Sequence, residues 1–197
     1  MKAVMPQVPE HFLERRRRIA ADRWDEMWEG ELHIPPAPTF EHQDLAGAME
    51  NWLRNHWAQP HGSKVYHQVN VASPGGWPDD YRIPDLVLLT PDRLHIKKRE
   101  YADGGPTVVV EIRSPGDESV EKLSFYARIG VQEAWIIDRD TKVPELYLLR
   151  GENYEQATSD ADGWLHSPAT GVGLRGESPN KLAIQLAGRP ETRELVP

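Results

Sequence analysis

The sequence of 197 residues contains no cysteine. The absence of thiols excludes disulfide scaffolds, zinc sites built on thiolates and a cysteine nucleophile. It is compatible with a reducing cytoplasm, where we expect the protein to act. Long apolar runs are also absent, since no stretch approaches the ~20 apolar residues that span a bilayer. The basic run at residues 15–18 has no apolar segment beside it, so we expect neither a secretory signal nor a membrane anchor.

An excess of basic charge is lacking as well. Lys and Arg number 23 against 31 Asp and Glu, which gives a net charge of -8. This balance argues against a protein that coats nucleic acid through bulk charge, but it leaves room for an enzyme with a local basic groove. From residue 81 to residue 130, eight basic and eight acidic residues cancel, so the acidic surplus comes from the flanking regions. The basic runs 15–18 and 97–99 could contact phosphates, although such runs are usually solvated.

Apolar periodicity predicts three helices, at residues 9–28, 40–57 and 117–129. Short β-rich runs predict strands at 64–71, 83–89, 107–112 and 134–138, followed by a hairpin of 144–149 with 153–158. The tail from 162 to 197 shows only one apolar patch, at 182–186. Strands around one strand–helix–strand crossover indicate an α/β (α+β) fold with a mixed central β-sheet flanked by helices. We expect a single domain over 1–197, with N-terminal helical and C-terminal extensions.

Two carboxylates stand out in this pattern. Glu111 interrupts an apolar strand, and Asp85 lies at the entry of another. A buried carboxylate is costly unless it is paired, hydrogen-bonded or bound to metal. One explanation is an internal ion pair of Glu111 with Arg113, Lys122 or Arg82. The other is an oxygen-rich site for Mg²⁺ or Mn²⁺, formed by two acids from neighbouring strands with a lysine from the following helix.

These residues belong to motifs that together resemble a known family. The motifs are Pro84-Asp85, Glu111-Ile112-Arg113-Ser114-Pro115, Lys122-Leu123, Tyr126, Gly130-Val131 and Trp135-Ile136-Ile137-Asp138, with Glu26, Gly30-Glu31-Leu32, Pro35-Pro36 and His42 upstream. They resemble the Uma-two family of restriction endonucleases, in the PD-(D/E)xK nuclease superfamily. The resemblance covers roughly residues 24–174 and implies a restriction-endonuclease-like core over that range.

The resemblance also implies a site. Asp85 and Glu111 would be the metal-binding acids, with the backbone carbonyl of Ile112 as a further ligand. The superfamily pattern has lysine two places after the acid, where this chain has Arg113, and arginine does not lose its proton in proteins. The lysine role would therefore pass to Lys122 on the following helix, and Arg113 would bind phosphate or pair with an acid.

Three further residues are expected to support this site. Glu26 either completes the metal shell or is a solvated acid near a helix end. His42 could hold a water or a phosphate near the metal, although a capping or surface role is favoured for it. Tyr126 lies one helical turn after Lys122 and is expected to pack against the lysine.

The function that the resemblance implies is Mg²⁺-dependent hydrolysis of DNA phosphodiester bonds by an endonuclease. Cutting both strands of a duplex would favour a homodimer with two-fold symmetry. The alternative is an inactive nuclease-like fold that binds nucleic acid or a protein partner, which the acidic total and Arg113 motivate. A glycosidase that uses Asp85 and Glu111 as its carboxylate pair is a weaker third reading.

Overall fold

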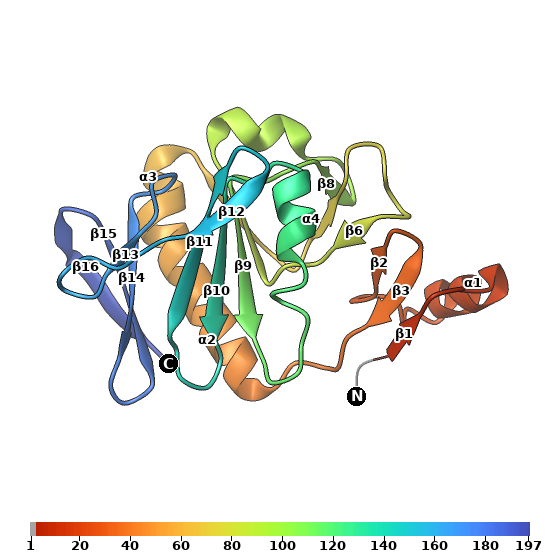
Figure 1. The fold of residues 1–197 in the computed structure, drawn as a ribbon, viewed down its shortest axis with the longest axis horizontal. Coiled ribbons are helices and arrows are strands. Elements are labelled where there is room, and N and C mark those ends of the chain that lie inside the picture. The colour runs from red at the N-terminus through yellow and green to blue at the C-terminus, as the bar shows by residue number, and fades with distance from the viewer. Residues whose placement is uncertain (1–2) are drawn as a thin grey trace.

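The central sheet of the protein is six-stranded and mixed (Figure 1). The computed structural model describes residues 3–197. Within the described residues of this sheet only β9 and β10 pair in parallel, and their two apolar runs are buried, as the sequence predicts for central strands. In spatial order the strands are β12 (Asn153–Gln156), β11 (Pro144–Arg150), β10 (Glu133–Asp138), β9 (Val108–Arg113), β7 (Leu86–Leu89) and β4 (Lys64–His67).

Helices cover both faces of this sheet, with α4 (Leu123–Arg128) in front of it and α2 (Phe40–Trp52) behind it in Figure 1. The α2 helix begins after Thr39, whose hydroxyl accepts the N–H of His42. It continues into η1 (Leu53–Ala58) and α3 (Gln59–His61), so the predicted helix at 40–57 is confirmed. Its apolar stripe enters the core that also contains residues of β9 and β10.

The crossover helix is shorter than the sequence predicts. It was expected over 117–129, but α4 begins only at Leu123. Asp117 accepts the backbone N–H groups of Ser114 and Ser119, and Gly116 adopts φ +77°. These local hydrogen bonds compete with helix formation, so residues 117–122 form turns and place Lys122 at the start of the helix.

A second six-stranded sheet forms the N-terminal side of the molecule (Figure 1). The predicted helix at 9–28 is wrong in its second half, because α1 (Glu10–Arg18) stops and residues 26–28 form a strand. Glu29 and Gly30 have φ of 50° and 90°, which makes a tight turn and lets β2 pair with β3. In spatial order the strands are β1 (Ala3–Met5), β3 (Glu31–Ile34), β2 (Glu26–Trp28), β6 (Tyr81–Arg82), β5 (Asn70–Ala72) and β8 (Tyr101–Asp103).

The predicted strand at 64–71 is split between the two large sheets. Gln68 adopts φ 46°, so the chain leaves β4 and enters β5 in the other sheet. The predicted strand at 83–89 is shortened to β7, and the separate strand β6 lies just before it, while the hairpin of β11 with β12 is confirmed. The short helix η2 (Pro91–Ile96) connects β7 to β8.

The C-terminal tail forms a third sheet, which the sequence indicated only as one apolar patch. Its strands are β13 (Leu165–His166), β14 (Val172–Glu177), β15 (Lys181–Leu186) and β16 (Arg189–Val196), and all pair antiparallel. Apolar side chains of this sheet share one core cluster with α2 and β10, and the indole of Trp52 donates to the carbonyl of Thr192 at 2.8 Å. Among residues 3–197 no helix combines the length and apolarity needed to cross a membrane.

We predict that Glu133 is essential for attaching the C-terminal segment to β10. Its buried carboxylate accepts hydrogen bonds from Trp135 Nε1 at 3.0 Å, Ser167 Oγ at 2.6 Å and the backbone N–H of Ala169 at 2.7 Å. Glu133→Ala leaves these donors unpaired and is expected to lower the free energy of unfolding by about 2–4 kcal/mol in urea titrations. The exposed control Glu155→Ala is expected to stay within about 0.5 kcal/mol of wild type. An equal effect of both substitutions would contradict this role.

Candidate functional site

The antiparallel pairing of β7 with β9 brings Asp85 and Glu111 together. Leu86 pairs with Val110, so the residue before β7 lies beside Glu111 on the neighbouring strand. Both acids are buried, with 7% and 4% of their surfaces exposed. The Asp85 carboxylate accepts the backbone N–H of Ile112 at 2.7 Å. The N–H and C=O of an extended residue point to the same side of the strand, so the Ile112 carbonyl also faces Asp85.

Glu111 lies beneath α4 and is held by two residues of that region. The Tyr126 hydroxyl donates to Glu111 Oε1 at 2.5 Å, and Lys122 Nζ lies 3.3 Å from the carboxylate oxygens. Burial raises the pKa of Glu111 to about 8; Asp85 and Glu26 add to the rise, while Lys122 and Tyr126 oppose it. The carboxyl group therefore needs more positive charge nearby than Lys122 provides to stay ionised at neutral pH.

Glu26 joins this cluster from β2 in the other large sheet. Its Oε1 lies 2.8 Å from Lys122 Nζ and accepts the N–H of Ile83 at 2.8 Å, and the second oxygen accepts the Trp28 indole N–H. Because Glu26 is only 5% exposed, the interpretation of a solvated acid at a helix end is wrong. Burial by itself lowers the pKa of Lys122, but Glu111 and Glu26 raise it above its ordinary value, so the amine stays charged.

His42 is the clearest correction among the supporting residues. A capping or surface role was favoured for it, yet Thr39 supplies the cap of α2 and the His42 Nε2 atom lies 2.8 Å from Asp85 Oδ1. The helix therefore presents this imidazole to the acid that precedes β7.

The roles of Tyr126 and Arg113 are also defined by their contacts. Tyr126 is fully buried and packs as expected, but its hydroxyl contacts Glu111 instead of the lysine. Arg113 pairs with Glu145 at 2.8 Å and Asp138 at 3.5 Å, so of its two expected roles the ion pair is the one observed.

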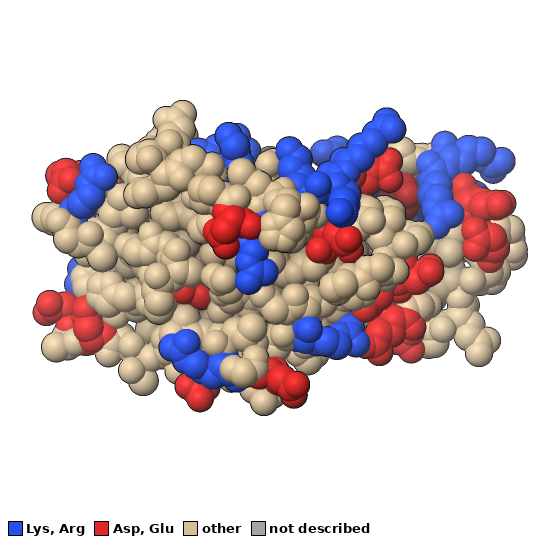
Figure 2. All heavy atoms as spheres, turned by 90° about the horizontal axis from the view of Figure 1, so that it is seen from above, with Lys and Arg blue, Asp and Glu red and all other residues tan. Residues whose placement is uncertain are grey.

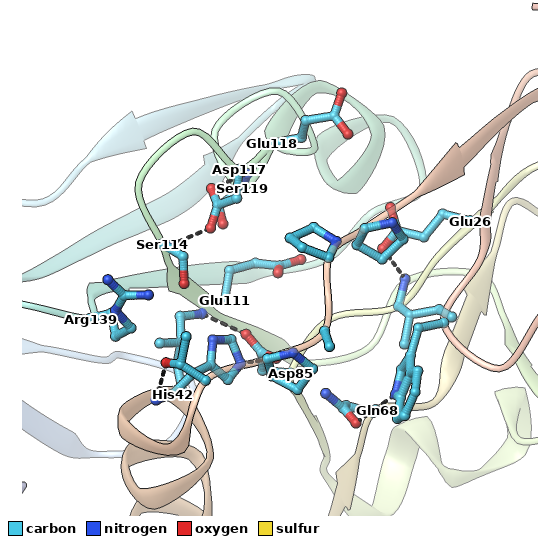
Figure 3. Close-up of a pocket in the computed structure, with 18 of the residues that line it drawn as sticks. Glu26, His42, Gln68, Asp85, Glu111, Ser114, Asp117, Glu118, Ser119 and Arg139 are labelled. Carbon is cyan, nitrogen blue, oxygen red and sulfur yellow. Dashed lines mark hydrogen bonds and ion pairs between the residues drawn. The ribbon is translucent and has the colours of Figure 1, made fainter. Parts of the chain in front are cut away.

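These groups open onto a cleft of about 280 Å³ (Figure 3). The proline-rich segment 35–39 forms one wall and residues 114–119 form another, and Figure 3 shows Glu111 and Asp85 pointing into the space between them. The acids along the lining are Glu26, Asp85, Glu111, Asp117 and Glu118, whereas the Lys and Arg residues that residues 3–197 contribute to it are Lys122 and Arg139. The cleft is therefore strongly acidic.

Among the polar residues of this lining, sequence reasoning missed His33, Gln68, Glu118 and Arg139. His33 Nδ1 lies 3.0 Å from Glu118, its ring stacks on Trp28 at 4.0 Å, and Arg139 and Gln68 complete the cleft. His33 lies on a strand that was not predicted, and no spacing in the sequence connects it to Glu118, 85 positions later.

The donor set of the cleft fits a hard divalent cation. Asp85, Glu111 and the Ile112 carbonyl would supply oxygen ligands, which Mg²⁺ and Mn²⁺ prefer. A bound cation would also supply the positive charge that Glu111 needs to stay ionised beside Asp85 and Glu26. Within residues 3–197 no three acidic or histidine side chains are already gathered as a complete metal shell, so the carbonyl and solvent would have to complete the coordination.

Comparisons with known proteins agree with this architecture. The sequence model of the Uma2 family, described as "Putative restriction endonuclease", matches residues 9–185. Among solved structures, a protein of Anabaena variabilis ATCC 29413 reported as a "putative nuclease belonging to DUF820" superimposes with a TM-score of 0.61 at 16% identity. The match covers 74% of this chain and 82% of that one, and at this identity it supports the fold alone. No curated protein matches the sequence.

We predict that Lys122 is the main stabilising charge of the buried cluster. Lys122→Met leaves Glu26 and Glu111 without their cation, and the expected loss is about 3–5 kcal/mol of unfolding free energy, measured by urea denaturation in EDTA. Adding Glu26→Gln to this variant removes one unpaired acid and is expected to recover part of the loss. Strictly additive effects of the two substitutions would show that the two side chains are not coupled.

Proposed function

The chain belongs to the Uma2 family, and on this premise we propose that it is a metal-dependent endonuclease that hydrolyses phosphodiester bonds of DNA. The observation that supports the proposal is the convergence of Asp85, Glu111, Glu26 and Lys122 in one cleft from four separate segments of the chain. Nothing in a stable core requires three acids at one point, since buried charges are generally no more stabilising than apolar residues of similar size.

Asp85, Glu111 and the Ile112 carbonyl would hold Mg²⁺ or Mn²⁺. The bound ion would lower the pKa of a coordinated water and stabilise the departing oxygen. The protein's own contribution is to fix the acids before substrate arrives. Asp85 is held between His42 and the N–H of Ile112, and Glu111 accepts the hydroxyl of Tyr126. Such outer contacts orient ligands and typically change metal affinity by about 10–100-fold when removed.

Lys122 is assigned an electrostatic role. Glu111 and Glu26 raise its pKa, which makes the amine a poor base for removing a proton from water. A permanently charged amine between Glu26 and Glu111 can instead orient the attacking water and offset the charge that develops on the phosphate.

A binding protein of the same fold is the second candidate. The acidic cleft and the arginine in place of the usual lysine motivate it. Calorimetric titration with Mn²⁺ distinguishes the nuclease from the binding protein. The proposed enzyme must bind Mn²⁺, and it must lose this binding when Asp85 and Glu111 are replaced. We also propose a homodimer for the cutting of both strands, and sedimentation with and without duplex DNA would test it.

One prediction of this function concerns the proposed metal ligands Asp85 and Glu111. With Mg²⁺ or Mn²⁺ and supercoiled plasmid DNA, Asp85→Asn and Glu111→Gln are each expected to lower the cleavage rate by at least about 100-fold, since each removes a negative metal ligand. The control Glu155→Gln removes an exposed acid of β12 and is expected to leave the rate unchanged. Undiminished cutting by either site variant would refute the assignment.

Another prediction compares the contributions of Lys122 and Arg113 to the cleavage rate. Because Arg113 is engaged by Glu145 and Asp138, Arg113→Gln is expected to keep cleavage within about 5-fold of wild type. Lys122→Gln is expected to lose about 100-fold or more, the scale of one transition-state contact. The reverse order would mean that the arginine, and not the helix lysine, serves the reaction. Circular dichroism melting curves of both variants would show whether the folded state is retained.

A further inference from the structure

A second cavity lies along β7, on the face of the central sheet that α4 covers. Its volume is about 220 Å³. The floor is formed by Val87 and Leu89 of β7 with Val69 and Ala102. Val87 and Leu89 belong to the same core cluster as Tyr126, the residue that holds Glu111. Residues two positions apart in a strand lie on the same face, roughly 7 Å from each other. Asp85 precedes Val87 by two positions, so the cavity begins about one nucleotide's length from Asp85.

The polar residues of this cavity are three cations, two tyrosines and one acid, Glu100. Lys97, Lys98 and Arg99 border it together with Tyr66 and Tyr101. The Lys97 amine lies 5.1 Å from the centre of the Tyr66 ring, and Lys98 reaches Asp103 at 3.8 Å. Within the described part of the chain, neither Lys97 nor Arg99 takes part in an ion pair, so both charges are available to an anion.

The other basic run of the sequence is engaged in ion pairs at two of its four arginines. In residues 15–18, Arg16 is bound by Asp25 and Arg17 lies 3.6 Å from Glu10. Figure 2 shows acidic and basic side chains interspersed over the face seen from above. Lys97 and Arg99 line a cavity, whereas residues 15–18 line neither the cleft nor this cavity, so the cations after η2 are the better candidates for phosphate contacts.

The two cavities have complementary charge. The cleft at Asp85 and Glu111 is lined by five acids and repels a phosphate backbone, so affinity for DNA must come from a neighbouring surface. Gln68 lines the cleft and the next residue, Val69, lines the second cavity, which makes the two adjacent along the chain. A small apolar pocket with an aromatic wall suits one base, and the basic rim suits the phosphates on either side of it.

We propose that this cavity receives an unpaired nucleotide of the DNA strand next to the cut site, with Lys97 and Arg99 contacting its phosphates and Tyr66 contacting its base. The preferred substrate would then be DNA with a single-stranded stretch, not a fully paired duplex. The proposal rests on the nuclease function and specifies its substrate.

Binding of fluorescein-labelled DNA, followed by anisotropy in EDTA, tests this independently of cleavage. The wild-type protein is expected to bind a duplex with a single-stranded overhang about 10-fold or more tightly than the blunt duplex of the same sequence. Lys97→Ala/Arg99→Ala is expected to remove this preference. It should also reduce the slope of log Kd against log salt concentration for the overhang by about 1.4, since two phosphate contacts to a single strand are lost.

The matched control is Lys181→Ala/Arg189→Ala, which removes two exposed charges from the C-terminal sheet and is expected to change neither affinity nor salt slope. Tyr66→Leu keeps the cavity apolar and is expected to lose the overhang preference, whereas Tyr66→Phe keeps it. Thermal melting of each variant identifies loss of folding.

Two outcomes overturn the proposal. One is equal wild-type affinity for overhang and blunt DNA, and the other is a Lys97→Ala/Arg99→Ala variant that behaves like the control. If the wild-type protein cuts plasmid DNA but shows either result, only the second cavity has been misassigned. If it neither binds nor cuts any DNA, the nuclease function itself fails.

Discussion

The ion pair of Lys122 with Glu26 and Glu111 is the contact on which the arrangement of the site depends. One amine reaches two carboxylates, at 2.8 Å and 3.3 Å, from strands in two different sheets. Without it, two acids would be buried close together with no opposite charge between them, which is unfavourable in a low-dielectric interior. The amine thus ties the N-terminal sheet to the central sheet at the floor of the cleft.

The surrounding fold supplies rigid positions for the other groups. Glu111 lies on β9 and Asp85 directly precedes its partner strand β7, and His42 and Tyr126 come from helices on opposite faces of the same sheet. Side chains on such elements are held more precisely than side chains on loops, because packing fixes their rotamers. The wall at residues 114–119 contains no helix or strand, and its Asp117 is held instead by the backbone N–H groups of Ser114 and Ser119.

The net charge of -8 has a structural interpretation in this light. Part of the acidity is concentrated in the cleft, where it suits a divalent cation and opposes a bare phosphate. The unpaired cations near the second cavity lie at a separate place on the surface. Segregation of the two kinds of charge lets an acidic protein have one surface for metal and another for a polyanion.

The sequence by itself determined the strands that surround Glu111 and the presence of a carboxylate where apolar residues are expected. Those features are local, because the period of a strand and the cost of a buried charge are visible within a few residues. Only the tertiary structure decided that Glu26 lies on a strand, that His42 contacts Asp85 across 43 positions, and that the tail forms a sheet. Each of these depends on pairing between distant segments, whose energy outweighs the local preference for helix or loop and leaves no periodic trace in the chain.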